Sequence, residues 1–180
     1  MELASIQPLS RFERSAFSFL IALSINTSLL TERKPLVDIQ LTRTHVDQII
    51  AHARDSAPQE CCGVIGGMPG GIGGMPGGMA KTIYRTRNLA ADPLVTYEAA
   101  PEDLFAAQRQ MREFGEHLIA IYHSHPRSGN PEPSATDVRL AYYPSAVYLI
   151  VGLGNDEPRV RAFRINEREG WKAIEYQIVD

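Results

Sequence analysis

The order of strand-like and helix-like segments between Val37 and Val179 limits the folds open to this chain. Short stretches of alternating or continuous apolar residues are typical of strands, and two longer stretches repeat apolar residues at helical spacing. One helix is predicted early in this region and one in its middle, with strands before, between and after them. This mixed order predicts an α/β sandwich built on a curved, mostly antiparallel β-sheet flanked by helices.

The predicted helices have recognisable starts. Thr42 or Thr44 can cap the first, whose apolar positions are Val46, Ile49, Ile50 and Ala53. Pro101 and the acidic residues after it open the second, and Gly115 ends it. Its predicted inward face is Leu104, Ala107, Gln108, Met111 and Phe114. A short third helix is predicted over 134–141.

The predicted strands are Val37–Leu41, Cys61–Ile65, Lys81–Thr86, Leu94–Glu98, Leu118–Tyr122, Ala146–Val151, Val160–Ile165 and Ala173–Val179. Between the second and third lies Gly66–Gly78, a low-complexity segment that cannot fill a core and that we interpret as an expanded, flexible hairpin loop. A glycine-rich phosphate cradle is the alternative, but the segment lacks the Lys-Ser/Thr of a P-loop and the helix that opens a dinucleotide site.

Residues 1–35 are predicted to be an N-terminal appendage, helical or disordered, before a domain over 36–180 with a glycine-rich loop at 66–79. The apolar stretch 16–30 is too short and too polar to span a bilayer. A signal peptide is the alternative, but Glu2 and Glu13 lie upstream and no A-x-A cleavage site follows. Whether these residues belong to the mature protein stays open.

Charge and cysteine content narrow the functional classes. The 180 residues carry a net charge of −3 with both signs scattered, so no basic face for nucleic acid is expected, and no membrane partner either. The two cysteines, Cys61 and Cys62, are adjacent, which argues against a structural disulfide and fits a reducing cytoplasm. We interpret them as buried apolar residues rather than ligands.

A His-x-His pair at the end of a predicted buried strand is the feature of the sequence that indicates a metal site. His123 and His125 follow the apolar run Leu118–Tyr122, and residues two apart in a strand point to the same side. Asp137, near the start of the next helix, can add a third ligand, and two histidines with one carboxylate leave a fourth tetrahedral position for water. His-x-His alone is weak evidence, and Ser134-x-x-Asp137 can be only a helix-capping box.

Together these residues resemble a known motif. Glu60 followed by Cys-Cys-Gly-Val-Ile-Gly, the segment Ala-Ile-Tyr-His-Ser-His-Pro ending in His125-Pro, and Ser134-x-x-Asp137 resemble the JAMM (MPN+, Mov34/PAD-1) metallopeptidase family from about Val37 to Val179. The resemblance implies the MPN/JAMM fold, a cytidine-deaminase-like sandwich. It also implies His123, His125 and Asp137 as ligands of one Zn²⁺ per chain, Glu60 as general base and acid, and Ser134 as a donor to the oxyanion. The spacing departs from the family, since eight residues rather than seven separate His125 from Ser134.

Within the family, the stretch from His123 to Val151 resembles small bacterial stand-alone members. That resemblance implies cleavage of an amide bond at the C-terminal glycine of a ubiquitin-like sulfur-carrier protein ending in Gly-Gly, with release of cysteine or another amine. A general small-peptide or isopeptide metallopeptidase is one alternative. A non-catalytic MPN-type interaction module, which would be expected to lack ligands, is another. The natural substrate and the oligomeric state stay open.

Overall fold

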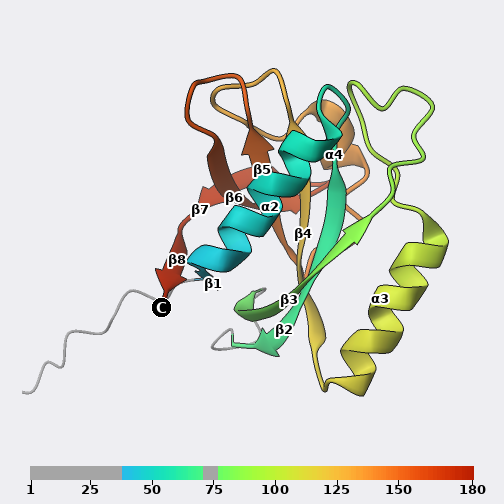
Figure 1. Cartoon of the computed structure of the whole chain (residues 1–180), viewed down its shortest axis with the longest axis vertical. Helices are drawn as coiled ribbons and strands as arrows, with labels where there is room; N and C mark the ends of the chain where they lie inside the picture. Colours follow the sequence, from blue (N-terminus) through green and yellow to red (C-terminus); the bar gives the residue numbers. More distant parts are fainter. Residues whose placement is uncertain (1–37, 71–76) are drawn as a thin grey trace, which may run out of the picture. The chain divides into compact units, whose positions relative to one another are not determined.

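The computed structural model describes residues 38–70 and 77–180, so the predicted appendage and the centre of the glycine-rich segment lie outside the described residues. Eight strands of this part of the chain form one mixed sheet in the order β7-β6-β5-β4-β2-β3-β1-β8. The strands are β1 (Ile39–Thr42), β2 (Cys62–Pro69), β3 (Gly78–Thr86), β4 (His117–His125), β5 (Val147–Gly152), β6 (Arg159–Asn166), β7 (Gly170–Ile174) and β8 (Tyr176–Val179). Figure 1 shows these strands with the helices packed on them.

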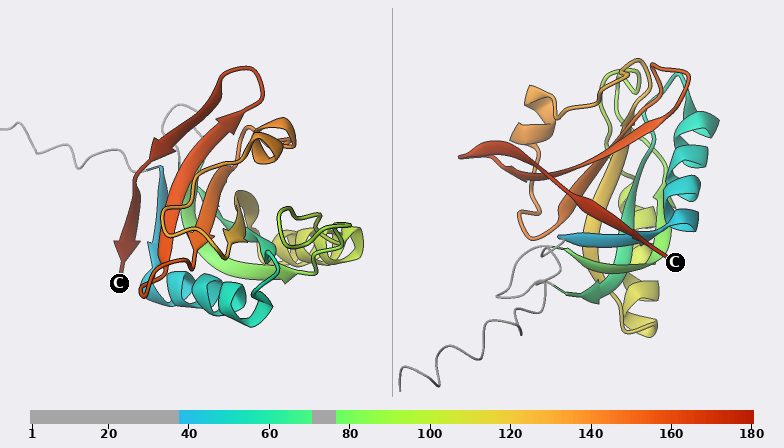
Figure 2. Two further views of the ribbon diagram at one scale, coloured as in Figure 1. Left: turned by 90° about the horizontal axis from the view of Figure 1, so that it is seen from above. Right: turned by 90° about the vertical axis from the view of Figure 1, so that its left-hand side faces the viewer.

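The sheet curls because its two outermost strands follow one another in sequence. Only Glu175 separates β7 from β8, yet β7 pairs with β6 and β8 pairs with β1 at the other end of the order. One residue spans only a few ångströms, so the two ends of the sheet must meet there, as the curvature in Figure 2 shows. The predicted single strand Ala173–Val179 is therefore wrong. The predicted mostly antiparallel pairing holds for four of the seven neighbouring strand pairs.

Helix α2 (Arg43–Ser56) covers one face of the sheet. Thr42 caps it in a capping box in which His45 Nδ1 accepts a hydrogen bond from the Thr42 backbone N–H. The helix buries three of the predicted apolar residues, Val46, Ile49 and Ala53, while Ile50 is only partly buried. They pack against one core cluster of the sheet, which includes Ile65, Tyr122, Leu149 and Val151.

Helix α3 (Pro101–Glu113) covers the opposite face, and Pro101 stands in its first turn as predicted. It buries Ala107 and Met111 against a second core cluster that includes Val64, Ile121, Tyr148 and Ile150. Phe114, predicted to point inward, is 66% exposed because the helix ends before it, and Gly115 turns the chain with a φ of +67°. The short helix α4 (Ala135–Arg139) follows β4.

One loop prediction and one strand prediction need correction. Strand β2 continues to Pro69 and β3 begins at Gly78, so the ends of the segment Gly66–Gly78 are strand rather than loop. No strand forms over Leu94–Glu98. Instead the Asn88 side chain supplies the hydrogen bonds that a neighbouring strand would: its Nδ2 donates to the backbone oxygens of Glu60 and Thr96, and its Oδ1 accepts from the Glu98 backbone N–H.

Among the described residues, no helix is long and apolar enough to cross a membrane.

Candidate metal centre

Strand β4 places its two histidines on the α3 face of the sheet. His123 is fully buried and His125 is 17% exposed at its side chain. Ser124, between them, points to the other face, where its Oγ accepts a hydrogen bond of 2.8 Å from the Cys61 backbone N–H. Cys62 lies opposite His123 in the β2–β4 ladder. Because Glu60 precedes this ladder by two residues, it is carried to the end of β4 where the histidines lie.

Three predicted ligands converge there. The Nε2 atoms of His123 and His125 are 3.2 Å apart. Asp137 Oδ1 lies 3.3 Å from the first of them, and Asp137 Oδ2 lies 3.4 Å from the second. One ligand atom from each residue lies within 4.8 Å of the others, which makes this a group that can hold a metal ion.

Asp137 is positioned by the start of helix α4. The Ser134 backbone N–H donates to Asp137 Oδ2 at 2.7 Å, and the Asp137 backbone N–H donates to Ser134 Oγ at 3.2 Å. The capping box is therefore compatible with the predicted ligand role of Asp137, because the cap fixes the carboxylate that it contains. Ser134 itself is exposed, and its hydroxyl hydrogen is not used by this box.

The loop that carries the extra residue is anchored along its length. Arg161, on β6, donates to the Pro131 backbone oxygen and pairs with Glu132 at 2.8 Å. The Asn155 side chain donates to the Gly129 backbone oxygen at 3.1 Å. These contacts hold residues 126–133 against the β5–β6 end of the sheet, so the longer spacing does not prevent Asp137 from reaching the histidines.

Glu60 lies beside this group with an unpartnered oxygen. Its Oε1 is 3.9 Å from His125 Nε2, and its buried Oε2 has no hydrogen-bond partner among the described residues. Burial, reinforced by the charge of Asp137, raises the pKa of Glu60 to about 7 in spite of the nearby His125 and Arg127. A carboxyl group with such a pKa can both accept and return a proton near neutral pH.

Burial and hydrogen bonding shift the pKa values of the other members of the site. Burial raises the pKa of Asp137 in principle, but hydrogen bonds with His123 and His125 outweigh it and hold that pKa far below its usual range. Burial lowers the pKa of His123, whereas Asp137 outweighs burial at His125 and raises the pKa there. An ionised carboxylate beside a neutral buried imidazole is the state that metal binding requires.

The geometry fits a tetrahedral cation. Ligand atoms about 2.1 Å from a tetrahedral zinc ion stand about 3.4 Å from one another. The two histidine Nε2 atoms are 3.2 Å apart, and each lies 3.3 or 3.4 Å from a different oxygen of the Asp137 carboxylate. The cysteines do not add to the set. Burial raises the pKa of Cys61 to about 12 and of Cys62 to about 11, so both are neutral thiols, as expected of buried apolar residues.

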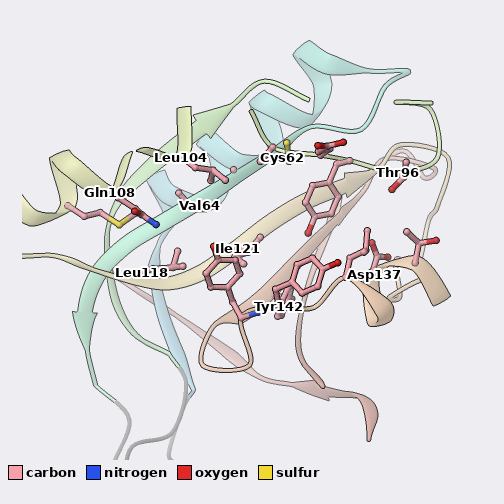
Figure 3. A pocket seen from close by; sticks show the side chains of 18 residues that line it. Cys62, Val64, Thr96, Leu104, Gln108, Leu118, Ile121, Asp137 and Tyr142 are labelled. Carbon is pink, nitrogen blue, oxygen red and sulfur yellow. Dashed lines mark hydrogen bonds between the residues drawn. The ribbon is translucent and has the colours of Figure 1, made fainter. Parts of the chain in front are cut away.

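An apolar pocket of about 220 Å³ adjoins the group, with Asp137 in its wall. Figure 3 shows Asp137 at one end and Leu104 and Gln108, from α3, at the other. Tyrosines 97, 142, 143 and 148 contribute to the lining. The pocket thus leads from the apolar face of α3 to the candidate ligand Asp137.

Sequence reasoning missed three residues at this site. Tyr97 stacks on the His123 ring, with centroids 4.5 Å apart and planes at 26°. Asn88 organises the loop that carries Tyr97, and Ser124 joins β4 to the start of β2. Of these three residues, only Ser124 could be placed from the sequence, because side chains alternate along a strand and Ser124 must therefore point to the opposite side from the two histidines.

Comparison with known proteins points to one family. Residues 42–166 match the family described as prokaryotic homologs of the JAB domain. A desampylase from Haloferax volcanii is 38% identical over 111 residues, which cover 58% of this chain and 73% of the desampylase. A CysO-cysteine peptidase from Mycobacterium tuberculosis is 32% identical over 135 residues, covering 74% and 87% of the two chains. A probable TtuB-protein conjugate cleaving protease from Thermus thermophilus is 30% identical over 129 residues, covering 72% and 77%.

Solved structures agree on the fold. The solution structure of a protein from Desulfitobacterium hafniense has 31% identity and a TM-score of 0.69, with coverage of 79% of this chain and 93% of that protein. A JAB1/MPN domain protein from Archaeoglobus fulgidus has 17% identity and a TM-score of 0.50, covering 81% and 99%, and supports the fold alone.

Proposed function

This chain belongs to the family of prokaryotic homologs of the JAB domain, a family of metal-dependent hydrolases, and from that premise we propose a substrate and a set of roles. The proposed reaction is hydrolysis of the amide bond at the C-terminal glycine of a ubiquitin-like sulfur-carrier protein. The products are the carrier with a free carboxylate and cysteine or another amine. The observation that carries the proposal is the convergence of His123, His125 and Asp137 beside the buried carboxyl of Glu60.

We propose Zn²⁺ as the metal, one ion per chain, with those two histidines and Asp137 as its ligands. Two nitrogens and one carboxylate suit zinc, and three protein ligands leave a position open as in catalytic sites. A zinc ion bound there would supply a Lewis acid for the scissile carbonyl and lower the pKa of water to about 7.

Glu60 is the proposed carrier of the proton. Its pKa of about 7 lets it accept a proton from the attacking water and then donate it to the departing amine. The unpartnered Oε2 is free for this exchange. Ser134 is the proposed donor to the developing oxyanion, because its Oγ accepts from the Asp137 backbone and its own hydrogen remains available.

The substrate class is proposed from the relatives and the pocket. The names of the relatives describe a desampylase, a CysO-cysteine peptidase and a TtuB-protein conjugate cleaving protease. The apolar pocket beside Asp137 offers room for the tail of such a carrier upstream of its glycines. Glycines at the scissile end let the backbone approach the buried site closely, since they have no side chain to clash. We also propose the cytoplasm as the site of action, because both cysteines are free thiols.

Mass spectrometry of three defined substrates tests the proposal. The full chain, loaded with zinc, is incubated with a Gly-Gly carrier joined to cysteine, with the same carrier joined to a lysine side chain, and with a short unrelated peptide. We expect the carrier to lose its attached amine and end in glycine. Cleavage of the unrelated peptide alone would favour the general metallopeptidase and overturn the carrier assignment.

A further inference from the structure

One ring nitrogen of the candidate ligand His123 has no partner among the described residues. Its Nε2 faces the other ligands, at 3.2 Å from His125 Nε2 and 3.3 Å from Asp137 Oδ1. Its Nδ1, on the other side of the ring, is buried and has no hydrogen-bond partner among the described residues. Metal-binding histidines almost always donate this second N–H to a carboxylate, a carbonyl or water, and that bond fixes the ring. At His123 no described residue makes that bond.

The Tyr97 ring lies where it can fix the plane of the His123 ring. It stacks nearly parallel on the His123 imidazole, at 4.5 Å between centroids and 26° between planes. The residues on either side of Tyr97 are tied to Asn88, whose side chain bonds the Thr96 backbone oxygen at 3.1 Å and the Glu98 backbone N–H at 3.0 Å. The tyrosine is therefore presented by a braced loop rather than by a free one. Tyr97 also lines the apolar pocket, so its ring separates His123 from that space.

We propose that Tyr97 is a positioning residue whose stacked ring face sets the plane of the His123 imidazole, whose Nδ1 is bonded by no described residue. The inference rests on the proposed role of His123 as a metal ligand. Stacking uses the face of the ring, so the phenol hydroxyl is not required. Loss of the ring frees the imidazole to turn its Nε2 away from the other two ligands, and this weakens metal binding before any substrate is present.

Zinc affinity of the full chain tests this inference. Dissociation constants are measured by competition with a chromogenic chelator for the wild type and for Tyr97→Leu, Tyr97→Phe and Tyr142→Leu. We expect Tyr97→Leu to bind zinc more weakly by on the order of tenfold, the scale of lost aromatic stacking and lost support of a ligand. Tyr97→Phe should retain the wild-type constant. Tyr142 lines the same pocket and is 74% exposed, so the matched Tyr142→Leu change should leave zinc affinity unaltered.

Two further readouts separate positioning from general stability. The visible spectrum of the cobalt-substituted protein reports ligand geometry, and it should change in Tyr97→Leu but not in Tyr97→Phe. Thermal unfolding of the metal-free proteins should be similar for all variants. If Tyr97→Leu does not fold, Tyr97→Gln replaces it with the same expectation.

Wild-type zinc affinity in Tyr97→Leu, or equal losses in Tyr97→Leu and Tyr97→Phe, would overturn the inference while leaving the metal site intact. A wild-type protein that binds no zinc would instead overturn the proposed site on which the inference rests.

Discussion

At the scale of single residues, hydrogen bonding separates the pKa values of two neighbouring buried carboxyl groups. Asp137 bonds to two imidazoles and to the start of α4, so it stays ionised. Glu60 is equally buried but has one oxygen without a partner, and its pKa rises to about 7. Two acids with pKa values moved apart by their surroundings form a familiar pattern in active sites. The residue types alone did not reveal this division, because it depends on which hydrogen bonds each carboxyl group makes after folding.

A buried histidine outside the site predicts how stability depends on pH. His52, on α2, bonds the Tyr122 hydroxyl at 2.9 Å. Burial and the charge of Arg85 lower its pKa from 6.5 to about 4, against the opposing charge of Asp55. At a pH between about 4 and 6.5, His52 is protonated in the unfolded chain but neutral in the native protein. The unfolded state therefore binds more protons, and the free energy of unfolding falls as the pH drops from about 7 towards 4. The full effect of such a shift is on the order of 3 kcal/mol.

Replacement of His52 should reduce the loss of unfolding free energy between pH 7 and pH 5. Urea unfolding of His52→Gln and of the wild type, compared at pH 7 and pH 5, checks this, because the other histidines are present in both proteins. His117→Gln is the matched control, since His117 is exposed. An equally steep loss of stability in His52→Gln and the wild type would show that His52 is not the source of this dependence.

At the scale of elements, helix starts that depend on neighbouring residues in sequence were predicted correctly, whereas strands whose limits depend on pairing with distant segments were not. The start of α3 at Pro101 and the cap of α2 at Thr42 were predictable, because capping involves residues a few positions apart. The break between β7 and β8 at Glu175 was not predictable from sequence. It arises because β7 pairs with β6 while β8 pairs with β1. Leu94–Glu98 has the composition of a strand, but the Asn88 side chain takes the place of a neighbouring strand.

The hairpin between β2 and β3 should tolerate shortening. Pro69 pairs with Gly78, and hairpin loops need only about two to five residues. Deletion of four residues from 71–76, with Gly70 and Gly77 kept, should change the free energy of unfolding by less than about 1 kcal/mol, because closure entropy varies slowly with loop length.

Gly77→Ala is the contrasting change for this hairpin. Gly77 has a φ of +112°, and a Cβ there would overlap the Asp38 backbone oxygen, so we expect a clear loss of stability. Urea unfolding measures both effects. Unfolding of the shortened protein under native conditions would refute our view of the loop.

At the scale of the whole molecule, the candidate site is assembled by the curled sheet and not by any one segment. The β2–β4 ladder sets Glu60 beside the histidines, and Arg161 on β6 anchors the loop that leads to Asp137. The His-x-His pair and the distant acids were identifiable from sequence through their family resemblance. The stacked Tyr97 was not, because its place over His123 depends on a loop braced by long-range side-chain bonds.

Removal of residues 1–35 should leave hydrolysis intact. Every proposed site residue lies between Glu60 and Asp137, and the described sheet begins at Ile39. A chain that begins at Leu36 is expected to bind zinc and to cleave the carrier adduct with the kcat/KM of the full protein. A truncated protein that binds zinc normally but turns over no substrate would contradict this expectation and assign the missing segment a role in catalysis.

The central claim is that Glu60 moves the proton at a metal site formed by His123, His125 and Asp137. Glu60→Gln keeps the size and polarity of the side chain but cannot accept a proton near neutral pH. Zinc content by elemental analysis, measured beside the rate of hydrolysis of a carrier–cysteine adduct, gives the most direct test. We predict full zinc content and a rate lower by about 10²–10⁴ for Glu60→Gln, whereas Asp137→Asn should lose zinc and activity together. A Glu60→Gln rate equal to that of the wild type would contradict the account.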